Sequence, residues 1–365
     1  MDRRALLRGA GAAAAAATAA ACSGRRGGAG IGTRRRVRWR IASSFPRSLD
    51  TIYGAAEVLA ERVEALSGGN FRIRVHQAGE IVPALQVLDA VQEGAVEVGH
   101  TAGYYYIGKD PALAFDTCMP FGLTSRQQTA WLREGGGLKL TREVYDRFGL
   151  INFPGGNTGA QMGGWFRKEV NTLGDLQGLR MRIPGLGGEV MSRLGVSVQV
   201  LAGGDIYVAL ERGAIDATEF SGPYDDEKLG FHKVARYYYY PGWWEPGPNL
   251  SIVVNKREWE RLPDIYKEIF QTACSEAATT MQARYDQHNA ESFARLVKGG
   301  TQLRRFSDEI MDAARDKTRE IMREHAGKDP LYAKIFEQWD AWRASAHAWF
   351  ATTEGAFAAY AFKAP

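Results

Sequence analysis

The stretch GLRMRIPGLGGEVMSRLGVSVQVLA, residues 178–202, decides the fold class. Its first part alternates apolar and basic residues up to Pro184-Gly185, which is typical of a strand that ends in a turn. Helical spacing follows in GEVMSRLG, and VSVQVLA then has the pattern of a second strand. A strand, a helix and a further strand in close succession predict α/β layers with a largely parallel sheet.

The same alternation continues on both sides of this stretch. Toward the C-terminus, DIYVALERG is predicted to be helical and AIDATEFSG to form a strand; toward the N-terminus, strands are predicted in FRIRVHQAG and AVEVGHTAG. From about Pro263 onward the pattern becomes almost wholly helical. The final helical segment carries Trp339, Trp342, Trp349 and Phe350 at helical spacing. We expect this aromatic surface to pack on the body or on another subunit.

One arginine of the opening stretch stands where ligands bind in such folds. Arg180 and Arg182 share one face of the predicted strand, and Arg182 is the last basic residue before the turn. The carboxyl ends of parallel strands face the ligand crevice. A guanidinium at that place suits a carboxylate, because its planar fork matches two oxygens. The alternative is a surface salt bridge.

Two isolated acidic residues stand in apolar surroundings. Glu219 ends the strand AIDATEFSG, and Glu245 follows an aromatic run in YYYYPGWWEPGP, residues 237–248. A buried carboxylate is costly unless it is paired or coordinates a cation. These two carboxylates, the side-chain carbonyl of Gln161 and a ligand carboxylate would form an all-oxygen shell, which suits Na⁺ or Ca²⁺ better than a transition metal.

Other polar residues admit two interpretations. Asn157 and Gln161 lie in the glycine-rich segment GNTGAQMGGWF, where their amides either contact a carboxylate and a cation or satisfy the backbone of a turn. Asp225, Asp226 and Glu227 are predicted to be solvated structural residues at the start of a helix, where acids favour the helix dipole.

The N-terminus has the features of an export signal over residues 1–21. Three arginines precede an alanine-rich run that is too short and too weakly apolar for a stable membrane span. DRRALL resembles a twin-arginine motif. The tetrapeptide ending at Cys22 resembles a lipobox, in which Cys22 would carry the lipid, and cleavage after an A-x-A site is the alternative. Residues 22–36 form a basic Gly/Arg linker.

The charge distribution separates the linker from the body. The net charge is +4 for the whole chain, +2 for residues 1–21, +7 for residues 22–40 and −5 for residues 41–365. The basic linker either lies against anionic lipid or is simply solvated. The body lacks the basic footprint that nucleic-acid binding requires.

The sequence lacks the common signatures of catalytic and metal sites. There is no P-loop, no Rossmann glycine motif after a strand, no GxSxG and no HExxH. Cys118 and Cys274 have no metal-ligand spacing, and we expect both to be buried free thiols.

Three long segments together resemble the solute-binding receptors of TRAP transporters, most of all the subgroup that binds 2-oxo acids and lactate. They are residues 156–185, residues 202–219 and residues 221–245, the last of which contains GWWE. The similarity extends over about residues 37–350. It implies a periplasmic receptor that closes around a small 2-oxo or 2-hydroxy monocarboxylate and delivers it to a membrane permease.

The resemblance also implies an α/β, two-lobed fold like that of periplasmic binding proteins, with the ligand cleft between the lobes and long C-terminal helices. The first lobe would comprise about residues 37–160 with part of the C-terminal region. The second would comprise residues 161–260, followed by a helical segment, 263–365. Some members of the subgroup dimerise through a swapped C-terminal helix, and the aromatic tail would suit a homodimer of that kind.

The resemblance assigns individual site residues as well. It implies that Arg182 binds the ligand carboxylate and that Gln161 touches both the ligand and the cation. Glu219, the backbone carbonyl of Phe220 and Glu245 would complete the Na⁺ or Ca²⁺ shell. The family usually has tryptophan where this chain has Phe220, which changes the pocket wall and therefore the ligand size preference. The remaining ligand-binding residues are Asn157, Tyr104, Tyr105 and Phe45.

A metal-dependent lyase acting on a 2-oxo acid is the alternative from another class. It would share the carboxylate, cation and arginine site. It would also need an acid or base within reach of the reacting carbon. Lys228 and His232 are the nearest candidates, and they lie beyond the Glu219 strand on a predicted helix.

Overall fold

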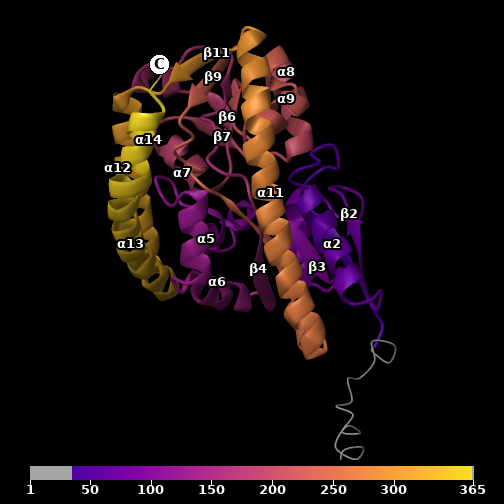
Figure 1. Cartoon of the computed structure of the whole chain (residues 1–365). Coiled ribbons are helices and arrows are strands. Elements are labelled where there is room, and N and C mark those ends of the chain that lie inside the picture. Colours follow the sequence, from indigo (N-terminus) through magenta and orange to yellow (C-terminus); the bar gives the residue numbers. More distant parts are fainter. Residues whose placement is uncertain (1–34, 364–365) are drawn as a thin grey trace, which may run out of the picture.

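The computed structural model describes residues 35–363, which form two lobes of mixed α/β structure around two sheets (Figure 1). The α/β fold predicted from the strand–helix alternation is confirmed. The export signal, Cys22 and most of the linker lie outside the described residues, so the predictions about them stay predictions.

The sheet of the first lobe has five strands in the order β2-β1-β3-β10-β4. β1 is parallel to β2 and β3, whereas β10 runs antiparallel to both of its neighbours. The sheet is therefore mixed rather than wholly parallel. Its strands are β1 (Val37–Ser43), β2 (Phe71–His76), β3 (Val98–Thr101), β4 (Leu150–Asn157) and β10 (Asn249–Asn255).

The sheet of the second lobe has six short strands in the order β11-β9-β5-β8-β6-β7. β6 is parallel to β7 and β8, and the register places Arg182 opposite Thr218. Arg182 and Glu219 thus meet where two neighbouring parallel strands end. The strands are β5 (Trp165–Phe166), β6 (Arg180–Arg182), β7 (Ser197–Gln199), β8 (Ala217–Thr218), β9 (Tyr237–Tyr240) and β11 (Gln302–Arg305).

Two strands lie elsewhere than the predicted lobe ranges place them. The range 161–260 includes β10, which instead pairs with β3 and β4 in the first sheet. The helical range 263–365 includes β11, which adds an edge to the second sheet beside β9. An apolar run such as that of β10 shows that a strand is buried, but it does not show which sheet the strand joins.

Short helices cover both sheets. Those of the first lobe are α2 (Gly54–Leu66), α3 (Val87–Gln92), α4 (Ala114–Thr117), α5 (Ser125–Arg133), α6 (Gly137–Asp146) and α10 (Lys256–Glu260), with 3₁₀ turns at Ala84–Gln86, Gly103–Tyr106 and Pro111–Leu113. Those of the second lobe are α7 (Gly185–Arg193), α8 (Ile206–Glu211) and α9 (Pro223–Leu229), with 3₁₀ turns at Leu173–Leu176, Gly203–Asp205 and Phe231–Lys233.

The long helix α11 (Asp264–Lys298) runs across both lobes (Figure 1). It packs against α2 and β4 in the first lobe and against α9 in the second. Its buried side chains recur every three or four residues, which is the spacing of one helix face. The helix follows Pro263 and ends before Gly299-Gly300, as expected for helix boundaries. It therefore contacts both lobes along its length.

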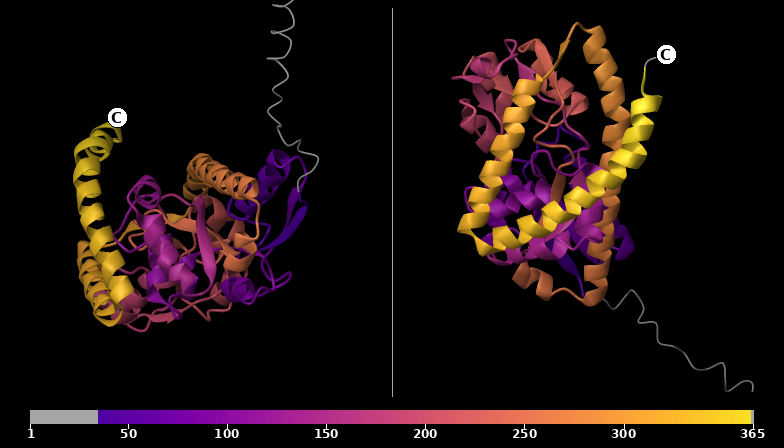
Figure 2. Two further views of the ribbon diagram at one scale, coloured as in Figure 1. Left: turned by 90° about the horizontal axis from the view of Figure 1, so that it is seen from below. Right: turned by 90° about the vertical axis from the view of Figure 1, so that its left-hand side faces the viewer.

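Two further long helices form an antiparallel C-terminal hairpin, α12 (Asp308–Lys328) and α13 (Pro330–Phe350). Ser307 and Asp329 cap their first turns by accepting hydrogen bonds from Ile310 and Leu331. A π-helical turn, Ala351–Gly355, leads into α14 (Ala356–Ala361), whose end stands clear of the lobes (Figure 2, left). Among the described residues, no helix is both long and apolar enough to cross a membrane.

The aromatic residues of this segment divide into two groups. Trp339 is buried against Phe115, with ring centroids 5.9 Å apart. Trp349 is 62% exposed, and the aromatic side chains of α14 and the residue after it are also exposed. The body therefore covers the first half of the aromatic face, and the second half is left without cover in this single chain.

Asp225 and Asp226 are buried, so the prediction that they are solvated is wrong. Asp225 accepts hydrogen bonds from Tyr285 of α11 and from Ser221, at 2.5 and 2.9 Å. Asp226 accepts them from Tyr238 and from the indole of Trp165, at 2.6 and 3.0 Å. Packing of α9 between the sheet and α11 closes this side of the helix from water. The partners needed to bury the acids come from distant parts of the chain.

Candidate functional site between the lobes

Arg182 is the centre of a buried polar site between the two lobes. It is only 1% exposed. Its Nε donates to the carbonyl of Leu201 at 3.0 Å, and its Nη1 donates to the backbone carbonyl of Glu219 at 3.1 Å and to the carboxylate of the same residue. Its Nη2 is buried without a partner among the described residues. Because Arg182 is buried, it does not form the surface salt bridge that was the alternative, whereas the exposed Arg180 pairs with Asp216.

Glu219 is fully buried and lies one residue beyond β8. One of its carboxylate oxygens bonds to Arg182, and the other, Oε2, has no partner among the residues described. Phe220 follows, with its ring 5.7 Å from the guanidinium carbon of Arg182. The ring also packs on Gly203, where an added Cβ would meet it at 2.8 Å. The ring of Phe220 therefore lies beside the arginine.

Glu245 and Gln161 are joined through their backbones. The amide of Gln161 donates to the carbonyl of Glu245, and the amide of Gly242 donates to the carbonyl of Gln161, each at 3.1 Å. A Cβ on Gly242 would lie 2.6 Å from the carbonyls of Gln161 and Met162, so only glycine allows this approach. The aromatic run before Glu245 thus positions the carboxylate beside the segment that carries the glutamine.

The first lobe contributes an aromatic wall. Tyr104 donates to Glu245 Oε2 at 3.3 Å, and its ring packs on Gly185, whose φ of +67° favours glycine. Tyr105 packs edge-on against Tyr104, with ring centroids 5.0 Å apart, and Phe45 lies 6.4 Å from Tyr105. The predicted residues Phe45, Tyr104 and Tyr105 therefore lie on the first-lobe side of the arginine and the two glutamates.

Asn157 has a different place from the one expected. Its side-chain amide donates to the carbonyl of Gly247 at 3.1 Å, and its side-chain oxygen accepts from the amide of Gly159 at 2.9 Å. These bonds tie the end of β4 to the segment before β10. Both bonds serve the loop, so Asn157 supports the site in this structure, and a contact with the ligand stays a prediction.

Two residues that hold side chains of the site were not predicted from the sequence. Thr158 accepts a hydrogen bond from the Gln161 side-chain amide at 3.1 Å, which leaves the amide oxygen of Gln161 as the free atom. Leu201 acts through its backbone carbonyl, which any residue could supply. For Thr158, the only signal in the sequence is its position three residues before Gln161. The role of the Leu201 carbonyl becomes visible only in the three-dimensional structure.

The unpartnered buried atoms of the site match a carboxylate bound together with a cation. Arg182 Nη2 is a free donor, whereas Gln161 Oε1 and Glu219 Oε2 are free acceptors. Buried polar atoms are rarely left unpaired. An anionic ligand would satisfy the donor, and a hard cation would satisfy the oxygens. Within the described part of the chain, no group of three or more His, Cys, Asp and Glu side chains gathers as a metal site. The two free acceptors, Gln161 Oε1 and Glu219 Oε2, are both oxygens, which suits Na⁺ or Ca²⁺.

The two carboxylates hold protons more tightly than usual when no cation is bound. Burial raises the pKa of Glu219 to about 7, although Arg182 opposes the shift. Burial and then the charge of Glu219 raise the pKa of Glu245 well above its ordinary range. Burial also raises the pKa of Tyr105 to about 12, so its hydroxyl stays protonated as a donor. A cation that neutralises the glutamates must displace protons.

We expect the ligand-free protein to lose stability as the pH rises. Glu219 has an ordinary pKa of 4.5 and a folded pKa of about 7, so the folded state binds more protons between these values. Its proton-linked stabilisation is complete below pH 4.5 and is lost through about pH 7. Asp225 and Asp226, with pKa values of about 6 and 7, act in the same direction.

Melting temperatures across roughly pH 5 to 8, in buffer free of sodium and calcium, would measure this loss of stability. Calcium together with pyruvate should reduce the decline, because the cation replaces the protons. A melting temperature that rises steadily over this range without a cation would contradict the raised pKa values of the buried acids.

Comparison with known proteins gives a consistent result. The model of the family described as bacterial extracellular solute-binding protein, family 7, matches residues 42–329. A monocarboxylate 2-oxoacid-binding periplasmic protein of Nostoc sp. is 58% identical over 313 residues, which cover 86% of each chain.

Solved structures agree with this match. A TRAP transporter solute-binding protein of Bordetella bronchiseptica has a TM-score of 0.89 and 46% identity, covering 90% of this chain and 98% of the other; it is a mixed-occupancy dimer with copurified calcium and picolinate in an active site. A TRAP periplasmic solute-binding protein of Pseudoalteromonas atlantica, with bound sodium and pyruvate, has a TM-score of 0.87 and 39% identity, covering 89% and 99%.

Proposed function

This chain belongs to family 7 of the bacterial extracellular solute-binding proteins, and on that premise we propose that it is a TRAP receptor for a small 2-oxo or 2-hydroxy monocarboxylate. The ligand binds between the lobes together with Na⁺ or Ca²⁺. The receptor then delivers it to the membrane permease. The site residues are Arg182, Gln161, Glu219, Phe220, Glu245, Tyr104, Tyr105 and Phe45.

One observation carries the proposal most directly. The free donor of Arg182 lies in the same buried site as the free oxygens of Gln161 and Glu219. A 2-oxo acid offers a carboxylate to the donor and a second oxygen that can join a cation shell. A simple monocarboxylate offers no such second oxygen away from its carboxylate. The pairing of charges also explains how a body with a net charge of −5 binds an anion.

Thermal stabilisation by ligands tests this function. Pyruvate, 2-oxobutyrate, longer 2-oxo acids and lactate should each raise the melting temperature in the presence of Na⁺ or Ca²⁺, and less without them. A ligand at about 100 times its dissociation constant stabilises the folded state by about 2.7 kcal/mol. Acetate is the matched control, because it keeps the carboxylate and lacks the 2-oxygen. If none of the 2-oxo or 2-hydroxy acids shifts the melting temperature with either cation, the proposal is wrong.

The contacts do not favour a lyase. Lys228 pairs with Asp50 and lies over the ring of Tyr224 at 4.3 Å, so it is engaged at the surface. His232 lines a different cavity beside Arg167 and Arg295. Neither residue is placed to act on a ligand held by Arg182. Recovery of 2-oxo acid unchanged after long incubation with the protein is the result expected of a receptor.

The exposed aromatic residues of the C-terminal segment support a homodimer. Trp349, Phe357, Tyr360 and Phe362 are all more than half exposed. Their number on one short segment is unusual for a surface that stays in water. We therefore extend the proposal to a dimer through the C-terminal helix. We also keep export by the twin-arginine-like signal and a lipid anchor at Cys22 as proposals from the sequence.

A further inference from the structure

The C-terminal hairpin forms a basic groove that the site between the lobes does not use. A cavity of about 200 Å³ lies between α12, α13 and the first-lobe loop at Pro120-Phe121. We call it the arginine groove, because four arginines line it. Its floor is apolar and includes Trp339, which is 2% exposed, and Met322. The arginines are Arg315, Arg319 and Arg323 of α12 and Arg343 of α13.

The arginines of α12 form a column of like charge. Arg315, Arg319 and Arg323 follow one another at intervals of four residues, so they lie on one face of the helix and repel one another. Arg315 pairs with Asp312 of its own helix at 2.8 Å. In the part of the chain that the structure describes, the guanidinium groups of Arg319 and Arg323 have no partner. The column is therefore only partly neutralised.

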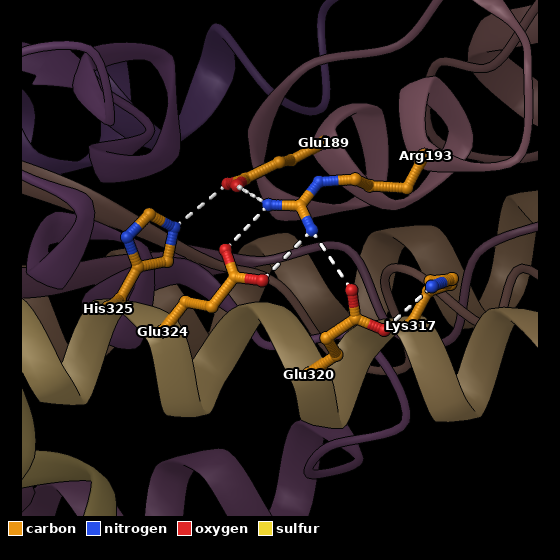
Figure 3. A network of polar contacts seen from close by, with 6 residues as sticks. All are labelled: Glu189, Arg193, Lys317, Glu320, Glu324 and His325. Atoms are coloured by element: carbon orange, nitrogen blue, oxygen red, sulfur yellow. Dashed lines mark hydrogen bonds and ion pairs between the residues drawn. The ribbon is translucent and has the colours of Figure 1, made fainter.

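Two of the acidic residues next to this column are engaged on another side of the helix. Glu320 and Glu324 directly follow Arg319 and Arg323, but they bond to Arg193 of α7, at 3.2 and 2.7 Å (Figure 3). His325 lies beside them and contacts Glu189 of α7 at 2.9 Å (Figure 3). These bonds fix α12 on the second lobe. They also engage two of the acids that stand next to the arginines.

The fourth arginine approaches from the other helix. Arg343 pairs with Asp340 at 2.6 Å, and its guanidinium carbon lies 5.5 Å from the centre of the Trp339 ring. Asp340 is the one acidic residue among those that line the groove. Four guanidinium groups against one carboxylate give the lining residues a net charge of +3, which becomes +2 when Asp312, the partner of Arg315, is counted, within a body whose net charge is −5. The positive charge is therefore a local feature of this groove.

We propose that the arginine groove is a second anion site, which takes a phosphate group. Planar guanidinium forks match the paired oxygens of phosphate, and arginine suits such sites better than lysine. The groove is smaller than the cavities that hold drug-sized ligands, and it suits one small oxyanion. The phosphate group comes either from free phosphate or from a phospholipid headgroup.

The test compares the protein with two double variants of equal charge. Arg319→Gln with Arg323→Gln removes the two unpaired arginines of the groove. Arg74→Gln with Arg257→Gln is the control, because these exposed arginines form no ion pair among the described residues and lie outside the groove. Inorganic phosphate is titrated at constant ionic strength against chloride, and the melting temperature and tryptophan fluorescence are recorded. In a second arm, the three proteins are floated with vesicles of phosphatidylglycerol and with neutral vesicles.

We expect phosphate or phosphatidylglycerol binding that is at least about tenfold weaker in the groove variant and unchanged in the control. The arm that responds identifies the source of the phosphate group. Arg182 is intact in all three proteins, so phosphate bound between the lobes would give equal responses, and that result would overturn the proposal. Absence of binding in both arms for the unaltered protein would overturn it as well. Neither result depends on whether 2-oxo acids bind.

Discussion

Replacing Arg182 by lysine is expected to weaken pyruvate binding on the order of 100-fold or more, because truncating one partner of a buried charge pair costs several kcal/mol. Lysine keeps the positive charge but loses the fork. The bonds of Nε to Leu201 and of Nη1 to the Glu219 backbone hold the guanidinium so that Nη2 is free for the ligand. An ammonium group cannot fill these roles at once, since it is a single point of charge on a flexible stem.

Arg180→Lys is the matched control for this variant. Arg180 lies two residues away on the same strand face, but it is exposed and pairs with Asp216 at 2.7 Å. Isothermal titration of both variants with pyruvate in calcium buffer gives the comparison, with circular dichroism to confirm that each is folded. Arg180→Lys should bind as the unaltered protein does. If Arg182→Lys also binds with unchanged affinity, the ligand carboxylate is not held by this arginine.

Features of the sheets that depend on neighbouring residues could be predicted from the sequence, and features that depend on distant residues could not. Alternating residues before Pro184-Gly185 place Arg182 at a strand end, and the structure confirms that position. The sheet to which β10 belongs depends on pairing with β3 and β4, which lie far away in the sequence. The burial of Asp225 and Asp226 likewise depends on Tyr285 and Tyr238. Contacts of this kind leave no periodic signal.

In the site, too, the sequence indicated which residues are buried but not which contacts they make. The isolated positions of Glu219 and Glu245 in apolar sequence indicate buried carboxylates, and both are buried. The sequence does not show that Tyr104 of the other lobe donates to Glu245, or that Thr158 orients Gln161. It also does not separate Gln161, which keeps a free oxygen, from Asn157, which does not. Both are amides in one short loop, and only the turn decides which of them faces the site.

Glu245→Gln is expected to weaken cation binding without destabilising the fold. The variant keeps the shape of the side chain and can still accept from Tyr104, but it removes one negative charge from the proposed shell. Charge count tunes the affinity of oxygen sites for Ca²⁺, so we expect calcium to bind on the order of 100-fold more weakly. The ligand-free variant should be at least as stable as the unaltered protein near neutral pH. Burial and Glu219 make the Glu245 carboxylate costly to ionise, since they raise its pKa well above the ordinary range.

Glu93→Gln supplies the control for Glu245→Gln, because Glu93 is exposed and lies outside the site. Calorimetry with calcium and pyruvate, in two buffers that differ in ionisation enthalpy, measures both affinity and the protons released. The unaltered protein and Glu93→Gln should release protons below about pH 7 as the cation displaces them, and Glu245→Gln should release fewer. Equal calcium affinity and equal proton release in all three proteins would show that Glu245 is a residue of the rim. If the Glu245→Gln variant is folded but binds calcium weakly and releases fewer protons, the carboxylate of Glu245 belongs to the cation shell. That role accounts for a lone glutamate at the end of an aromatic run.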